Sequence, residues 1–352
     1  MAYTTINKSS EYFDTKIYTG NGSSQTLDMD NLGLLWMKNR TEASNHNLFD
    51  VVRGGYYTSD PGPNLRPNGN TAGHGSDITS AYGITFGSSS STIGSDGGGY
   101  NYNQNGKSYV GWQWRANGTG STNTDGSITS TVSANTTAGF SIVKYTGTGS
   151  NATVGHGLGS VPKVMFVKRI STSSDWTCYF EALGNTKRAI LNSSAVPDTA
   201  STFWNSTTPT SSVFSVGTSG GTNASSETYI AYCFAEKQGF SKFGSFVGNG
   251  NDDGTFVYTG FKPSFILLKN TDIAASWLIN DNKRPGYNAN SQTLVPNNSE
   301  VENTGTDRTD FLSNGFKLRV GASTAWNGSG NNIIYMAFAE EPLVGDNPAT
   351  AR

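Results

Sequence analysis

The sequence has 352 residues, and its 24 Lys and Arg against 26 Asp and Glu leave a formal net charge of −2. Only 14% of its residues are charged, where about 25% is usual, which argues against nucleic acid or an anionic membrane surface as the main partner. The polar residues are mostly Ser, Thr, Asn and Gly, a composition typical of short strands joined by tight turns. We therefore expect an all-β protein without long helices.

Cysteine and histidine are too few for a disulfide framework or a structural zinc site. The cysteines are Cys178 and Cys233, and the three histidines, His46, His74 and His156, lie far apart in the sequence. We expect neither a metal nor a cofactor. The two cysteines form a bond only if their strands are adjacent, whereas two reduced thiols fit folding in a bacterial cytosol. No signal-peptide pattern and no long apolar run occur, so neither export nor membrane insertion is expected.

Residues 1–116 open the chain and predict a first β-sandwich. A Gly-x-Gly turn at 18–22 (YTGNG) precedes two apolar runs, 34–39 (LLWMKN) and 109–114 (YVGWQW). Short apolar runs bounded by Gly, Asn and Ser are typical of sandwich strands. The passage between the runs, residues 54–106, is rich in Gly, Pro and Tyr and predicts long loops.

Two pairs of tyrosines mark those loops, Tyr56 with Tyr57 and Tyr100 with Tyr102. Exposed tyrosine stacks on sugar rings and anchors protein interfaces at low entropic cost. We predict a receptor or glycan contact at these four residues. The alternative is that the rings fold under their own loops.

Residues 117–138 form a Ser/Thr-rich stretch that is open to two interpretations. One is a flexible linker. The other is an extended arm that adds a strand to a neighbouring sheet, and the β-branched residues at 128–132 (ITSTV) favour it.

Residues 139–238 and 239–342 are two copies of one unit. The turn at 145–149 (YTGTG) returns as 246–250 (FVGNG). Three landmarks return 101 residues further on: Pro162, Lys168 and Trp176 as Pro263, Lys269 and Trp277. With the more diverged first copy, the sequence predicts three tandem antiparallel β-sandwiches of about 100 residues and about seven to nine strands each, followed by a tail at 343–352.

Catalytic and metal patterns are weak. The stretch 217–221 (GTSGG) matches a nucleophile elbow at Ser219, but no helix pattern follows it. Residues 249–254 (NGNDDG) resemble a calcium loop but lack its closing Glu, and a hairpin turn explains them as well. Carboxylates for glycoside hydrolysis would come from Asp175, Glu181, Glu236, Asp310 and Glu340. Glu236 and Glu340 end equivalent runs in two copies, which favours a structural role, so we expect no catalytic residue and no enzyme.

Taken together, several motifs resemble a repetitive family of virion structural proteins from tailed phages of marine bacteria, cyanophages and pelagiphages among them. The motifs are residues 1–6 (MAYTTI), 36–40 (WMKNR), 48–54 (LFDVVRG), 111–118 (GWQWRANG) and 312–319 (LSNGFKLR). The resemblance covers nearly the whole chain and implies an exposed appendage assembled in the host cytoplasm.

This resemblance implies a non-enzymatic virion protein, first of all a tail fibre or spike component that helps attach the particle to the host surface. The partners would be further copies of the chain, a trimer in a fibre, together with other virion proteins and a host surface glycan. The alternative is a capsid decoration, head appendage or tail adaptor without a ligand of its own. A polysaccharide depolymerase is the third reading.

Overall fold

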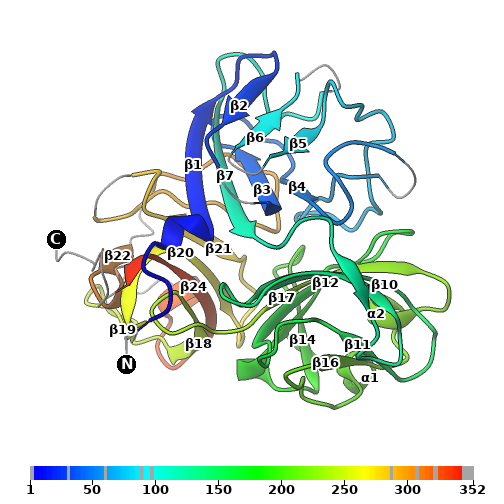
Figure 1. The fold of residues 1–352 in the computed structure, drawn as a ribbon. Helices are drawn as coiled ribbons and strands as arrows, with labels where there is room; N and C mark the ends of the chain where they lie inside the picture. Colours follow the sequence, from blue (N-terminus) through cyan, green and yellow to red (C-terminus); the bar gives the residue numbers. More distant parts are fainter. Residues whose placement is uncertain are drawn as a thin grey trace.

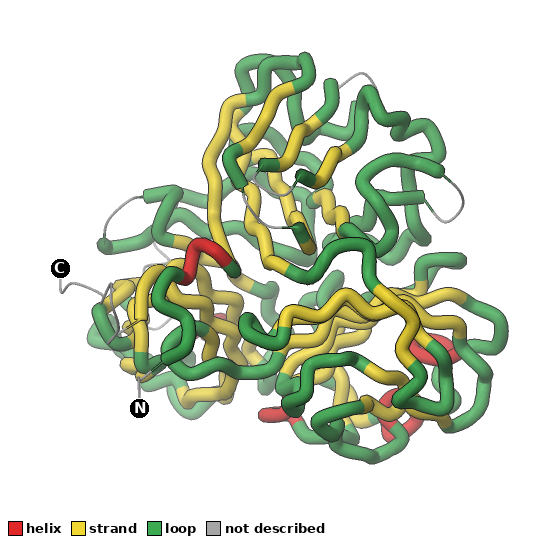
Figure 2. Tube along the Cα trace, viewed as in Figure 1, coloured by secondary structure: helices red, strands yellow, loops and turns green. Residues whose placement is uncertain are grey.

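The computed structural model describes residues 4–29, 32–58, 62–87, 90–95, 99–285, 288–305, 309–319 and 324–342. Within these ranges the chain consists mainly of antiparallel strands and loops, and its α-helices are single turns (Figures 1 and 2). The helical turns are α1 (Ser201–Trp204), α2 (Gly220–Asn223) and α3 (Thr324–Asn327), with 3₁₀ turns η1 (Ser9–Glu11) and η2 (Glu181–Leu183). The prediction of an all-β protein is confirmed. The predicted tail at 343–352 lies outside the described residues.

Three large antiparallel sheets share one strand order, in which the last strand of each segment lies between the first strand and a central one. We call residues 4–116, 139–238 and 239–342 segments 1, 2 and 3. Segment 1 orders β1 (Phe13–Thr19), β7 (Ser108–Arg115), β3 (Gly33–Asn39) and β4 (Asn47–Asp50). Segment 2 orders β10 (Phe140–Thr146), β17 (Thr228–Phe234), β12 (Val164–Arg169) and β13 (Thr177–Phe180). Segment 3 orders β18 (Ser241–Val247), β24 (Asn332–Pro342), β20 (Phe261–Asn270) and β21 (Leu278–Asp281).

A smaller sheet accompanies each large one. Segment 1 has β2 (Gln25–Leu27), β6 (Ser91–Ile93) and β5 (Ile84–Phe86), in that order. Segment 2 has β11 (Ala152–Gly155) with β16 (Val213–Val216). Segment 3 has β19 (Phe256–Tyr258), β23 (Gly315–Leu318) and β22 (Thr309–Leu312). An Asn-Gly turn at Asn314 joins β22 to β23.

The central strands β3, β12 and β20 are buried on both faces, which is why their sequences are continuous apolar runs instead of alternating ones. One face of each large sheet packs on a core common to all three segments. The other faces of segments 1 and 2 cover smaller clusters of their own. The largest core is shared by the three segments, which form three lobes around it (Figure 1).

Three aromatic rings, one from each large sheet, meet in the shared core. Trp114 of β7, Phe234 of β17 and Phe338 of β24 occupy corresponding positions, each on the last strand of its segment. Their ring centroids lie 6.1, 5.9 and 5.7 Å apart in the three pairings. The three sheets are therefore held face to face by direct contacts between every pair of segments.

The Ser/Thr-rich arm is ordered. Within it, β8 (Ser121–Asn123) pairs with β9 (Ser130–Asn135), and β9 pairs antiparallel with β10 along six residues. The amide of Ile128 also donates to the carbonyl of Thr153 in β11 (3.0 Å). The arm thus widens the sheet of segment 2, which continues at its opposite edge through β14 (Lys187–Ile190) and β15 (Asp198–Thr199).

Candidate functional site

Two of the four candidate tyrosines do not offer their rings to a ligand. Tyr100 and Tyr102 are 7% and 1% exposed, and their rings stack at 6.0 Å between centroids. The Tyr100 hydroxyl donates to the carboxylate of Asp77 and the Tyr102 hydroxyl to the carbonyl of Tyr82. The alternative reading, that these rings fold under their own loops, describes both. Burial also raises the pKa of Tyr100, with the neighbouring Asp77 adding to the effect.

The other pair is more accessible. Tyr56 is 39% exposed, and Tyr57 is half-buried, with its amide donating to the carbonyl of Ile78. Two aromatic side chains on β19 are more exposed than Tyr56: Phe256 and Tyr258 are 42% and 55% exposed. Sequence reasoning missed these two, although their alternation with the buried Val257 was the available signal.

The other sequence candidates have local structural roles. The Ser219 hydroxyl accepts the Gly221 amide (3.2 Å) and caps α2. In the loop at 249–254, the Asn249 amide donates to the side chain of Asn327, which in turn donates to the carbonyl of Asn251 (2.9 Å). This loop joins strands of two different sheets, so it is not the hairpin turn we expected.

The acidic candidates near strand ends are mostly engaged with basic side chains. Glu236 contacts Lys242 at 2.9 Å, and Glu340 contacts Lys262. Glu236 and Glu340 occupy equivalent positions in segments 2 and 3, and both form ion pairs. The lysine that pairs with Glu236 lies on β18, and the one that pairs with Glu340 lies on β20. Among the described residues no group of three or more His, Cys, Asp or Glu is placed to hold a metal ion.

The two cysteines are free and buried. Cys178 belongs to the shared core, whereas Cys233 belongs to the outer cluster of segment 2. The two thiols lie on opposite faces of one sheet and therefore do not form a disulfide. Of the two alternatives from the sequence, a bond or two reduced thiols, the structure has the reduced thiols. Burial raises the pKa of Cys233 to about 12, so this thiol is unreactive at neutral pH.

One polar network in the described residues links the segments to one another. Three short loops carry it, at 66–70, 190–194 and 295–299, and we call them the inter-segment loops. In each, the central Asn side chain accepts a backbone amide of its own segment at 2.9 Å: Asn68 from His46, Asn192 from Trp176, and Asn297 from Trp277. The Asn therefore fixes the loop beside the start of β4, β13 or β21 of its own segment.

The carbonyl two residues before each Asn accepts a ring N–H from the next segment. Trp176 donates to Arg66 (3.0 Å) and Trp277 donates to Ile190 (2.9 Å). His46 takes the corresponding place in segment 1, and its Nε2 lies 3.1 Å from the carbonyl of Val295. Segment 2 thus binds a loop of segment 1, segment 3 a loop of segment 2, and segment 1 a loop of segment 3, so the network closes on itself.

The protonation of His46 follows from its partners. A carbonyl oxygen can only accept, so the proton must sit on Nε2, and Nδ1 then accepts the indole N–H of Trp36 (2.9 Å). Burial, followed by the positive charge of Lys38, lowers the pKa of His46 well below its usual value. The imidazole therefore stays neutral and acts as a structural group in place of a tryptophan.

A buried lysine completes each junction by reaching the carbonyl two residues after the Asn. Lys168 donates to Asn70 (2.9 Å) and Lys269 to Ser194 (3.0 Å), while Lys38 lies 3.5 Å from the carbonyl of Ser299. All three lysine side chains are at most 1% exposed. Burial lowers the pKa of Lys38 and Lys269 to about 8 and that of Lys168 to about 7.

These lowered pKa values give a pH-dependent stability that can be measured. Between about pH 7 and pH 10 the unfolded chain keeps the Lys168 proton while the folded chain releases it, so stability rises with pH in this window. We expect the free energy of unfolding of the wild type, minus that of Lys168→Met, to increase from pH 7 to pH 10 in urea titrations. The same substitution at the exposed Lys8 controls for loss of one charge. A difference that does not change with pH would contradict this assignment.

Two of the three junctions also contain a buried ion pair. At the end of β4, Asp50 pairs with Arg53 (2.6 Å) and accepts the hydroxyl of Tyr232 from segment 2 (2.7 Å). At the end of β21, Asp281 and Arg284 pair at 2.7 Å, and Asp281 accepts the indole N–H of Trp112 from segment 1 (3.0 Å). The corresponding residues at the end of β13 are the apolar Phe180 and Leu183.

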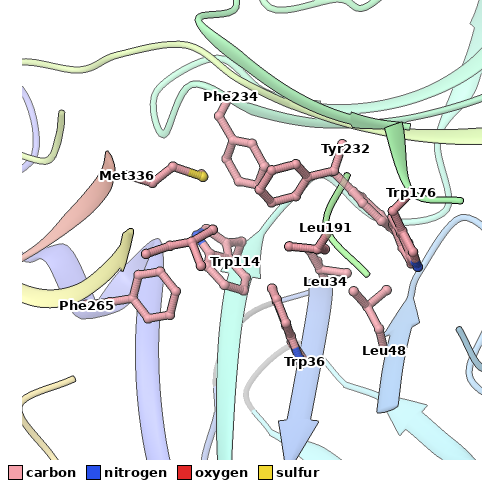
Figure 3. A pocket seen from close by; sticks show the side chains of 12 residues that line it. Leu34, Trp36, Leu48, Trp114, Trp176, Leu191, Tyr232, Phe234, Phe265 and Met336 are labelled. Atoms are coloured by element: carbon pink, nitrogen blue, oxygen red, sulfur yellow. The ribbon is translucent and has the colours of Figure 1, made fainter. Parts of the chain in front are cut away.

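The centre of the molecule leaves almost no free space. A cavity of about 10 Å³ lies among apolar side chains of all three segments, including Leu34, Tyr232 and Met336 (Figure 3). A space of this size, lined by apolar atoms, is at the limit of holding one water molecule and cannot hold a substrate. A larger groove of about 560 Å³ runs along the outer edge of β1.

The fold and these junctions define an all-β protein in which three similar sheets are locked around one core. The chain belongs to the family described as "Domain of unknown function (DUF7483)", whose model matches residues 8–342. No curated protein and no solved structure matches the chain. In the described residues no helix is long and apolar enough to cross a membrane.

Proposed function

We propose that this protein is a non-enzymatic structural component of a tailed-phage virion, built of three tandem β-sandwich repeats. The observation that carries the proposal is the closed network of inter-segment loops. Each repeat is held by the loop of the one before it, and segment 1 is held by segment 3, so the chain forms one block. Such a block suits a part that bears load and is assembled in many copies.

The distribution of polar groups supports a structural role. The buried lysines and the ion pair of Asp281 with Arg284 bond across or beside repeat junctions. The resemblance of the sequence to virion structural proteins of marine phages is the reason why we propose a phage virion as the particle to which the protein belongs. Among virion roles, a decoration, head appendage or adaptor is favoured over glycan binding at the loop tyrosines, because Tyr100 and Tyr102 are buried.

Attachment to the host surface is the second candidate function, and one observation favours it. Phe256 and Tyr258 present exposed rings on β19, and Val247, whose carbonyl accepts the hydroxyl of the neighbouring Thr255 (2.8 Å), is 52% exposed. Clustered exposed aromatics are typical of contact surfaces. A fibre or spike component, trimeric in the particle, would use this surface of segment 3 on a host glycan or on another virion protein.

Quantitative mass spectrometry of gradient-purified particles tests the proposal. We expect the intact chain in a fixed stoichiometry to the major capsid protein, and its absence from the particles would overturn the proposal. Particles carrying Phe256→Ser with Tyr258→Ser, compared with Tyr56→Ser, then separate the two candidates. A loss of host adsorption with normal particle assembly favours attachment, whereas unchanged adsorption favours a purely structural role.

A further inference from the structure

The outer edge of β1 has an unfilled strand position. In segment 2 the corresponding edge, that of β10, is covered by β9. In segment 1 the sheet ends at β1, and in the described residues no strand lies beyond it. The groove of about 560 Å³ runs along this edge and is lined by Asp14, Thr15, Lys16 and Ile17 of β1. An open edge of seven residues is a template for a further strand.

The backbone of β1 offers its free groups at alternate residues. The carbonyl of Tyr12 accepts the amide of Arg115, and the amide of Gly20 donates to the carbonyl of Lys107, both at 2.9 Å. Even-numbered residues therefore bond to β7, and the N–H and C=O groups of the odd-numbered ones point outward. The outward amide of Thr15 donates only to the carboxylate of Asp14 beside it (2.8 Å).

The sequence of β1 is complementary to itself when read in the opposite direction. In an antiparallel pair centred on Thr15, Asp14 of one copy lies opposite Lys16 of the other, and Phe13 lies opposite Ile17. Opposite charges and aromatic–β-branched pairs in direct opposition stabilise a sheet, and so do Thr–Thr pairs. The odd-numbered centre is the register that joins the outward backbone groups of both copies.

Two further observations point to the same partner. Thr15 is 3% exposed, yet its hydroxyl has no hydrogen-bond partner. A second Thr15 directly opposite would supply one. Ile17 is 39% exposed, and the facing strand would cover it. Lys16, which pairs loosely with Asp14 (3.4 Å) and Asp28 (3.8 Å), is free to exchange these contacts for a carboxylate of the partner.

We propose that two copies of this protein associate through β1, in an antiparallel twofold pair centred on Thr15 that joins their sheets edge to edge. The inference rests on the edge strand and is independent of the proposed virion role. It assigns the groove beside β1 to a second copy of the chain.

Sedimentation equilibrium of the full chain tests this pairing by charge exchange. We expect a dimer for the wild type. Asp14→Lys and Lys16→Asp each place like charges opposite one another and should raise the dissociation constant at least tenfold. The double variant restores opposite charges and should dimerise like the wild type. Lys144→Asp, on the covered strand β10, is the matched control and should leave the dimer unchanged.

A second variant removes the backbone contact itself. Thr15→Pro deletes an outward N–H that β7 does not use, so it should give a folded monomer, checked by circular dichroism. A monomeric wild type, a trimer, or a dimer that survives both charge reversals would overturn the proposal.

Discussion

Replacing Trp277 with alanine is expected to lower the free energy of unfolding by about 3–5 kcal/mol, the usual cost of removing a large aromatic side chain from a core. Trp277 is fully buried, its ring lies 5.9 Å from that of Phe180, and its N–H bonds to the carbonyl of Ile190. Both contacts belong to segment 2, so the loss falls on a junction and on the shared core together. Urea unfolding followed by fluorescence and by circular dichroism measures the change.

The conservative variant Trp277→Phe separates the two contributions. It keeps most of the apolar volume but removes the shorter of two hydrogen bonds to the Ile190 carbonyl, which then keeps only the Ser193 amide (3.3 Å), so we expect a loss of about 1–3 kcal/mol. Because the core is common to the three segments, both probes should report one transition in every variant. A loss below about 1 kcal/mol for the alanine variant, or separate transitions of the segments, would contradict the shared core.

Replacing Asp281 with alanine is the second large expected effect, again about 3–5 kcal/mol, because it removes one partner of a buried ion pair. Asp281 and Arg284 are both fully buried at their side chains, and Asp281 also accepts the amides of Lys283 and Arg284. The indole N–H of Trp112 would lose its acceptor as well. Chemical denaturation at pH 7 measures the loss.

Segment 2 suggests the control. There the corresponding positions are the apolar Phe180 and Leu183, so the double variant Asp281→Phe with Arg284→Leu replaces the pair by the residues that the fold already accepts elsewhere. We expect it to be less destabilised than Asp281→Ala, since the guanidinium is removed together with its carboxylate and Glu302, which also pairs with Arg284 (3.0 Å), keeps Arg40 as a partner (2.8 Å). A double variant that is less stable than the single one would show that the ion pair stabilises the junction beyond its own desolvation.

Local features of the fold were predictable from the sequence. The apolar runs are strands, and Lys168, Trp176, Lys269 and Trp277 were visible as landmarks at one spacing. What these side chains do was not predictable, because their partners are backbone carbonyls of another segment. A carbonyl has no signature in a sequence, so the spacing of the landmarks could not reveal that the junctions form a closed ring.

The substitutions in segment 1 hid its part of the network. His46 stands where the other segments have Trp176 and Trp277, and its lone imidazole gave no hint of a shared role. For the tyrosine loops the sequence suggested exposed rings, whereas Tyr100 and Tyr102 are buried. A Gly-rich context indicates exposure, but Asp77 and the carbonyl of Tyr82, which lie 23 and 20 residues from their partners in sequence, bond the two hydroxyls and hold the rings inside.

Cryo-electron microscopy of the particle that carries this chain tests the proposed function most directly. We predict density for the three-sheet block at a symmetric position on the virion, with a copy number set by that symmetry. We also predict that the three lobes stay packed around their common core in every copy. A particle without density for the block would contradict the assignment of this protein to the virion structure.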